Sequence, residues 1–151
     1  MSAAKPSSRS TYAWDMPARR FAYRLDPRSM AVLRLFGVRG PEDAWVDLGE
    51  DTLTARFGWF RANAPMANIA SWRIEGPWKW ITAIGVRRSF RHADITFGGS
   101  PVGGVRLDFR EPIKVGPLRT PALYLTVEDL GGLGEALAAR GIPGWDARKH
   151  R

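Results

Sequence analysis

The chain has 151 residues, no cysteine and a formal net charge of +8, with 23 Lys and Arg against 15 Asp and Glu. This length fits one ordinary domain with a real hydrophobic core, and the lack of cysteine excludes disulfides, cysteine metal sites and thiol catalysis. The longest apolar runs fall far short of a membrane span and the N-terminus has no hydrophobic signal core. The sequence therefore predicts a cytoplasmic protein without a transmembrane segment.

The positive charge is concentrated in two regions. Residues 1–40 carry eight basic and two acidic side chains, and residues 71–95 carry five and two. Charge of this kind attracts nucleic acid, anionic lipid or an acidic protein without choosing among them. Small, polar and basic residues with two prolines predict that residues 1–19 form a disordered arm.

The first half of the chain predicts a series of strands. From Phe21, apolar and polar residues alternate until Asp26-Pro27 ends the run, whereas residues 28–38 fit a short helix or a strand equally well. Residues 44–48 and 52–57 flank Gly49-Glu50-Asp51 and predict a β-hairpin.

The next stretch, FGWFRANAPMANIASWRIEGPWK at 57–79, is unusually aromatic. It predicts an extended run with a bend at Gly58, followed by a second alternating strand at 66–75. Its aromatic side chains are expected to fill the interior of a sheet.

The second half predicts a strand at 80–86, a basic loop at 87–92, and strands at 94–97, 105–109 and 122–127. The glycine-rich segment 98–104 is expected to be a hairpin turn. Glu128 and Asp129 cap a predicted helix at 130–140, and Gly141 is expected to end it. Its Leu133 and Leu137 are expected to face the sheet. Residues 143–151 are expected to be a loose tail.

These elements together predict an α+β fold that is mainly β. Its core is a strongly bent antiparallel sheet or small barrel of about seven strands, with one C-terminal helix.

Several stretches also resemble known families. The runs TLTARFG and APMANIASWRIEGP, with the closing YLTVEDLGGLGEALAARGIP, are similar to bacterial PH-like domains. AIGVRRS, ITFGG and GGVRLDFREP resemble an uncharacterised family of actinobacterial conserved hypothetical proteins. The resemblance covers residues 20–142 and implies a PH-like domain there. PH-like folds host lipid, peptide and protein binding, so the fold alone does not select an activity. The basic early hairpin of eukaryotic lipid-binding PH domains is replaced here by the acidic turn Gly49-Glu50-Asp51.

No motif in the sequence completes a catalytic site. His92-Ala93-Asp94 sets a histidine beside a carboxylate, as general bases require, but an exposed loop histidine is the favoured interpretation. A nucleophile elbow needs a glycine two residues after its serine, and a phosphate-binding loop ends in Gly-Lys-Ser/Thr. The segment 98–104 has neither feature. Asp108, Arg110 and Glu111 fit a surface ion pair, with Asp108 and Arg110 on one face of a strand. No catalytic residue, metal ligand or cofactor is predicted.

One cluster carries the functional prediction. Aromatic and cationic side chains suit an anionic interface, and the candidate binding residues are Trp78, Lys79, Arg87, Arg88, Arg91 and His92. The alternative interpretation of this cluster is a buried Trp80 beside a solvated arginine loop.

The sequence thus favours a non-enzymatic binding module, peripheral to the membrane if its partner is lipid. An anionic lipid surface or a protein is the expected partner, and nucleic acid is less favoured. The alternative is an enzyme or small-ligand carrier with a cavity between helix and sheet, lined by Asn68, His92 or Arg106.

Overall fold

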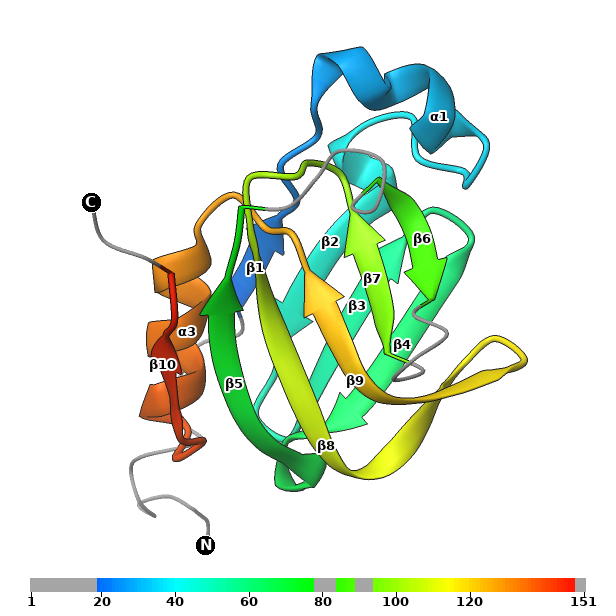
Figure 1. Ribbon diagram of the computed structural model, residues 1–151. Coiled ribbons are helices and arrows are strands. Elements are labelled where there is room, and N and C mark those ends of the chain that lie inside the picture. The colour runs from blue at the N-terminus through cyan, green and yellow to red at the C-terminus, as the bar shows by residue number, and fades with distance from the viewer. Residues whose placement is uncertain (1–18, 78–83, 89–93, 149–151) are drawn as a thin grey trace, which may run out of the picture.

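The computed structural model describes residues 19–77, 84–88 and 94–148, and its fold is mainly β (Figure 1). In chain order the strands are β1 (Arg19–Ala22), β2 (Ala44–Leu48), β3 (Thr52–Phe57), β4 (Phe60–Pro65), β5 (Ile69–Glu75), β6 (Gly85–Arg88), β7 (Ile95–Gly98), β8 (Gly104–Val115), β9 (Leu118–Leu125) and β10 (Gly144–Asp146). The helices are α1 (Met30–Arg34) and α3 (Leu130–Ala139), with 3-10 turns η2 (Pro27–Ser29), η3 (Pro41–Asp43) and η4 (Met66–Asn68). Within the described ranges, neither helix is long and apolar enough to cross a membrane.

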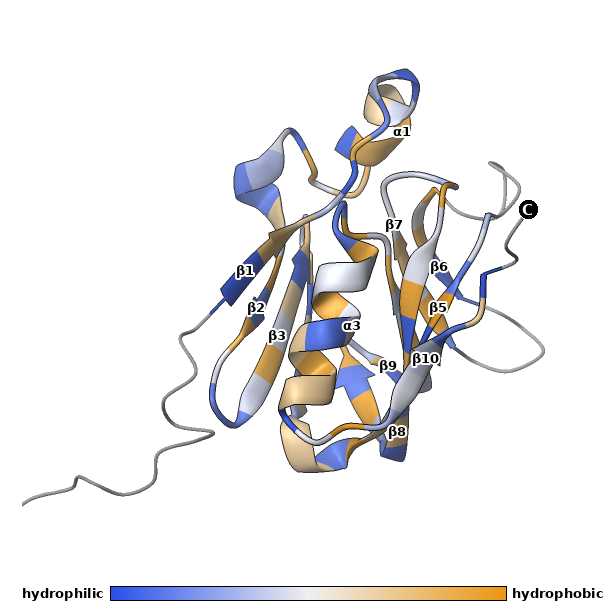
Figure 2. Cartoon of the chain, turned by 90° about the vertical axis from the view of Figure 1, so that its left-hand side faces the viewer, coloured by the Kyte–Doolittle hydropathy of each residue, from blue (hydrophilic) through white to orange (hydrophobic). Residues whose placement is uncertain are grey.

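The described strands form one sheet that bends into two layers. Its order is β1-β2-β3-β4-β8-β9-β7-β6, with β5 beside β8 and β10 beside β5. The long strand β8 connects the layers, since its first half pairs with β5 and its end meets β4 at Ala62 and Val115. Its pairing with β9 is interrupted between Asp108 and Ile113. Figure 2 shows α3 between the layer of β1–β3 and the layer of β5 and β10.

The sheet differs from the predicted one in number and direction of strands. Counted over the described residues it has ten strands rather than about seven, and it is mixed because β7 pairs with β9, and β10 with β5, in parallel. The undecided segment 28–38 contains the helix α1. Part of the tail predicted to be loose forms β10, held by hydrogen bonds from Trp72 N to Pro143 O (3.0 Å) and from Ala147 N to Ile74 O (2.9 Å).

The glycine-rich segment 98–104 is not a hairpin turn, because β9 lies between β7 and β8. The segment packs against the chain that leaves β1. Gly99 N donates to Thr126 Oγ1 at 2.9 Å, and Gly99 O accepts from Asp26 N at 2.8 Å. A Cβ on Gly99 would lie 2.4 Å from the carbonyl oxygen of Arg24. Glycine is therefore required here for close approach of two backbones.

The predicted β2–β3 hairpin and the C-terminal helix are confirmed. Leu48 pairs with Leu53 across the hairpin turn, and both side chains are fully buried. At the start of α3, the Asp129 carboxylate accepts from Gly132 N at 2.9 Å, as an N-cap should. The helix is followed by Gly141 at φ +85°, the left-handed conformation that favours glycine after a helix.

Helix α3 contacts the sheet through Trp72 of β5. The indole N–H of Trp72 donates to Ile142 O at 2.9 Å. A Cβ on Gly134 would lie 2.8 Å from the Trp72 ring, so the small residue lets the helix approach the indole. Leu133 and Leu137 are fully buried on the same helix, as predicted. The described contact between helix and sheet is therefore closely packed.

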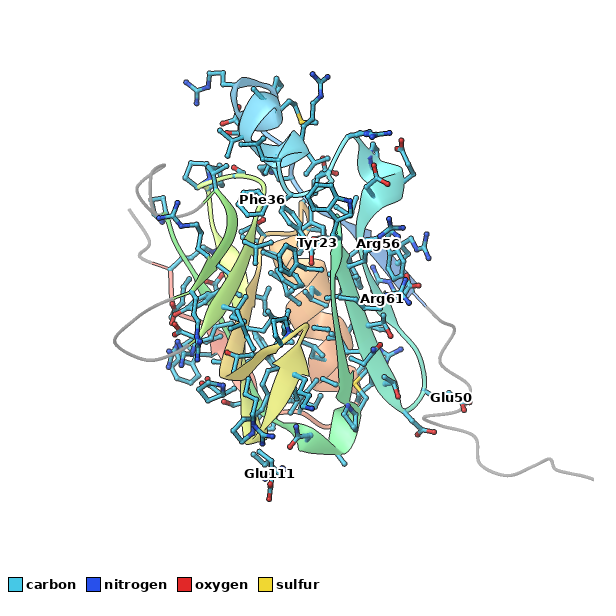
Figure 3. The ribbon with its side chains drawn as sticks, turned by 90° about the vertical axis from the view of Figure 1, so that its right-hand side faces the viewer. Tyr23, Phe36, Glu50, Arg56, Arg61 and Glu111 are labelled. Carbon is cyan, nitrogen blue, oxygen red and sulfur yellow. The ribbon has the colours of Figure 1, made fainter. Side chains whose placement is uncertain are left out.

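A row of three aromatic rings in contact joins the two layers. Tyr23 meets Phe57 of β3 edge-on at 5.0 Å between ring centroids, and Phe57 stacks on Phe97 of β7 at 5.7 Å. Figure 3 shows Tyr23 pointing between the layers. The Tyr23 hydroxyl has no hydrogen-bond partner within the described part of the chain. Burial raises the pKa of Tyr23 well above its ordinary value.

We expect Tyr23→Phe to raise the free energy of unfolding by about 1 kcal/mol, because it removes a buried, unpaired hydroxyl. The raised pKa also means that folding favours the protonated phenol. This contribution is fully present below the ordinary tyrosine pKa of 10.0 and is lost as pH rises through the folded value. Urea denaturation at neutral and alkaline pH should therefore show a smaller alkaline loss for Tyr23→Phe. Tyr124→Phe is the control and should not stabilise, since the Tyr124 hydroxyl accepts from Arg106 at 2.8 Å.

Candidate functional site

Two of the six predicted binding residues lie in the described part of the chain. Arg87 and Arg88 are exposed on β6, an edge strand, rather than in the predicted loop. Arg87 pairs with Thr96 and Arg88 with Ile95, so their Cβ atoms leave opposite faces of the strand. The other four lie outside the described residues, and they are Trp78, Lys79, Arg91 and His92.

The β8–β9 hairpin adds two cations to this end of β6. Lys114 and Arg119 are exposed cross-strand partners near the hairpin tip. The Arg88 guanidinium donates to the Arg119 carbonyl oxygen at 3.4 Å, which places the end of β6 against the hairpin. We call Arg87, Arg88, Lys114 and Arg119 the cationic edge. Sequence reasoning missed Lys114 and Arg119 because they lie more than twenty residues from β6 along the chain.

The cationic edge has no acidic partner in the described ranges, unlike the arginines that form ion pairs elsewhere on the sheet. Arg20 binds both carboxylate oxygens of Asp47, at 2.7 and 2.8 Å. Arg148 pairs with Asp146 at 2.7 Å. By contrast, none of the four cations of the edge forms an ion pair with any residue in the described ranges. Their charge is therefore available to an anionic partner.

The arginines at the end of the predicted arm do not join the cationic edge. Arg19 and Arg20 belong to β1, which lies at the opposite end of the strand order from β6, and Figures 1 and 2 both show the two strands apart. Arg20 also lies over the Trp45 ring at 4.3 Å while Asp47 neutralises it. Pairing with Asp47 of β2 therefore neutralises part of the positive charge that is concentrated in residues 1–40.

A second cluster surrounds Arg106 on the outer face of β8. The Arg106 Nη1 donates to Asp94 Oδ2 and to the Tyr124 hydroxyl, both at 2.8 Å, and its Nε donates to Asp108 Oδ1 at 3.0 Å. The side chains of Arg106 and Asp94 are 17% and 7% exposed, so this pair is largely removed from water. Val105 and Leu107, its neighbours on β8, face the opposite way and are fully buried.

The electrostatics of this cluster favour a structural role. Burial alone would lower the pKa of Arg106, but its interactions with Tyr124 and Asp108 outweigh burial and raise it. Burial raises the pKa of Tyr124, and the nearby Glu75 carboxylate raises it further against the opposing effect of Arg106. Tyr124 is therefore neutral at physiological pH, and Arg106 keeps its charge. The cluster is a saturated ion-pair network across neighbouring strands, without a nucleophile set against a base.

Several predicted neighbours have other partners. Asp94 binds Arg106, while His92 lies outside the described residues. Asp108 binds Arg106 rather than Arg110. Arg110 instead donates to Ala67 O at 3.0 Å.

Two residues of the cavity hypothesis, Asn68 and Arg106, lie in the described part of the chain, and both are engaged elsewhere than beneath α3; His92 lies outside the described residues. Asn68 is engaged by the backbone of Glu111 through two hydrogen bonds of 2.9 and 3.0 Å at the corner beside η4. Arg106 lies on the outer sheet face. A pocket of about 240 Å³ does open beside the start of α3, between Arg24, Asp129 and Arg148. In the described ranges, no group of three or more His, Asp or Glu side chains is placed to hold a metal ion.

One aromatic prediction is also corrected. Trp59 does not fill the sheet interior, and its side chain is 74% exposed. Phe57 pairs with Phe60, so Gly58 and Trp59 form a tight turn between β3 and β4 instead of a bend within one strand. The glycine at position 58 was the available sequence signal for a reversal, and in the structure it adopts φ +63°.

When this chain is compared with known proteins, no protein-family model, no characterised protein and no solved structure matches it.

Proposed function

We propose that this chain is a non-enzymatic binding module that recognises an anionic partner through the cationic edge. The single observation that carries the proposal is that four exposed cations of β6 and the β8–β9 hairpin lie together and form no ion pair within the described ranges. By contrast, carboxylates neutralise Arg20, Arg28, Arg56, Arg73, Arg106 and Arg148. Clustered charge matters because exposed charges act together only within a Debye length, about 8 Å at physiological salt.

A PH-like architecture is part of this proposal. The bent, mainly β sheet and the C-terminal helix between its layers support it. The three sequence stretches that resemble bacterial PH-like domains coincide with β3, with β4 and β5, and with the end of β9 and α3. Binding modules of this size need no deep cavity, since a charged edge and neighbouring loops can meet a flat partner.

Close packing beneath α3 weighs against the alternative of a ligand carrier or enzyme. Gly134 contacts the Trp72 ring, and Leu133 and Leu137 are fully buried at the same contact. Side chains therefore fill the space between α3 and the sheet at this contact, where the alternative places its cavity.

We expect Arg87→Glu with Arg88→Glu to weaken binding to anionic vesicles and to heparin by tenfold or more. Each basic residue near an anionic surface contributes about 1 kcal/mol, and reversal replaces that attraction with repulsion. Binding should be measured by vesicle sedimentation and heparin retention at about 50 mM salt and again at higher salt, which weakens a charge-driven interaction steeply.

The matched control carries the same change in net charge elsewhere. Arg110→Glu with Arg148→Glu alters the corner beside η4 and the end of β10, and it should retain most of the affinity. Circular dichroism of both variants checks that the fold is intact. If the wild-type chain binds neither vesicles nor heparin at low salt, the proposal is wrong.

A further inference from the structure

Two large apolar side chains on adjoining segments project into solvent at one end of the molecule. Leu35 follows α1 and is 73% exposed, and Trp59 in the β3–β4 turn is 74% exposed. The backbone N–H of Trp59 donates to Phe36 O at 3.0 Å, so the two segments are in direct contact. We call Leu35 and Trp59 the apolar tip. Single exposed apolar residues are ordinary, but two neighbouring ones from different segments form a feature that needs explanation.

The backbone around the apolar tip holds both side chains outward. Gly37 and Gly58 both have positive φ, at +87° and +63°. A Cβ on Gly58 would lie 1.9 Å from the carbonyl oxygen of Phe36, and a Cβ on Gly37 would lie 2.8 Å from the Trp59 indole. Both positions therefore require glycine, and the indole lies over Gly37 instead of turning into the core.

The apolar tip is anchored to the strand that carries the cationic edge. The Phe36 ring packs so closely on Gly85 of β6 that a Cβ there would lie 2.5 Å from it. Phe36 and Phe60 also meet, with ring centroids 6.4 Å apart. Gly85 is the first residue of β6, and Arg87 and Arg88 are its last two. One short strand therefore connects the apolar tip to the cationic edge.

Further cations flank the apolar tip directly. Arg34 and Arg39 lie on either side of Leu35 along the chain, are exposed, and form no ion pair with a residue in the described ranges. The nearby acids are Asp43, which pairs with Arg56 at 3.6 Å, and the exposed Glu42. An apolar tip surrounded mainly by cations is complementary to a surface that is negative outside and apolar beneath.

We propose that the apolar tip inserts into the interfacial region of an anionic lipid bilayer, while Arg34, Arg39 and the cationic edge contact lipid phosphates. This inference rests on the proposed function and names its partner. Tryptophan suits the interface because its ring is apolar and its N–H is a donor. A protein partner is less favoured, since two side chains supply too small an apolar core for a stable protein interface.

The test uses the absence of cysteine from the chain, which permits a single label at a chosen position. Leu35→Cys, labelled with an environment-sensitive fluorophore, is mixed with vesicles of equal parts phosphatidylcholine and phosphatidylglycerol. Glu50→Cys is the control, because Figure 3 shows Glu50 at the opposite end of the molecule from Phe36. We expect a blue-shifted, brighter emission that lipid-borne quenchers reduce at position 35, and no change at position 50.

A second pair of variants separates insertion from charge. Leu35→Ser with Trp59→Ser should lower vesicle affinity about tenfold through lost apolar burial and leave heparin binding unchanged. Trp145→Ser is the matched control, since Trp145 on β10 is also exposed, at 57%. It should change neither affinity.

The possible failures are distinguishable. If vesicles bind through Arg87 and Arg88 but the label at position 35 does not respond, the insertion is wrong and the anionic binding function stands. If heparin binds but vesicles do not, the partner is another anionic macromolecule, an acidic protein among them, and the bilayer inference is overturned. If neither binds, both proposals fail together.

Discussion

Replacing Leu137 with alanine is expected to lower the free energy of unfolding by about 2–5 kcal/mol, and Leu133→Ala by a similar amount. Both side chains are fully buried between α3 and the sheet. Each replacement removes apolar contacts and leaves a cavity in the closely packed interior. Chemical denaturation followed by tryptophan fluorescence would measure the change, because Trp72 lies at this contact.

The composition of α3 makes this effect large. Gly131, Gly132 and Gly134 fall within its ten residues, and each costs about 1 kcal/mol in helix propensity relative to alanine. An isolated helix of this length is marginal in any case. Tertiary packing therefore supplies most of its stability, and the two leucines supply much of the packing.

The control for this prediction is Glu135→Ala on the exposed side of the same helix. It should change the free energy of unfolding by less than about 0.5 kcal/mol, as surface substitutions usually do. Unchanged denaturation midpoints for both leucine variants would mean that α3 does not support the sheet as the structure indicates.

The second large effect is expected at Asp94. Asp94→Ala should cost about 3 kcal/mol, because it leaves the largely buried Arg106 guanidinium without one of its two carboxylate partners. Asp108→Ala should cost less, since the Asp108 side chain is 33% exposed and water can replace it. Urea denaturation of the two variants side by side measures this difference.

A double variant identifies the cause. If the cost of Asp94→Ala comes from the uncompensated charge, adding Arg106→Met should restore part of the lost stability, because an apolar side chain needs no partner. A double variant less stable than either single variant would contradict this explanation. It would point to packing or the hydrogen bond to Tyr124 as the main contribution.

Local sequence patterns predicted the elements whose neighbours are close along the chain. The β2–β3 hairpin was predicted with its observed limits, since two alternating runs flank a three-residue turn. The helix cap at Asp129 and the stop at Gly141 were also predicted, because capping depends on a few adjacent residues. The pattern at 28–38 could not distinguish helix from strand, and the structure places the short helix α1 there.

The errors occurred where distant segments meet. Segment 98–104 looked like a hairpin turn, but β9 separates the strands it connects. The three residues of β10 have no pattern of their own and become a strand only beside β5. Trp59 was assigned to the interior because the reversal at Gly58 was interpreted as a bend.

Some features of the candidate site could likewise be predicted from the sequence, whereas others depend on the tertiary structure. The sequence alone determined that the chain is basic, free of cysteine and mainly β, and that Arg87 and Arg88 belong to a cationic region. Only the tertiary structure decided which charges remain available, because ion pairs such as Arg20–Asp47 and Arg106–Asp94 join residues more than ten positions apart. Tertiary contacts also brought Arg119 to Arg88 and joined the turn of Trp59 to the segment that follows Leu35. Alternation and capping act over a few residues, whereas a surface is formed by contacts that only the folded sheet creates.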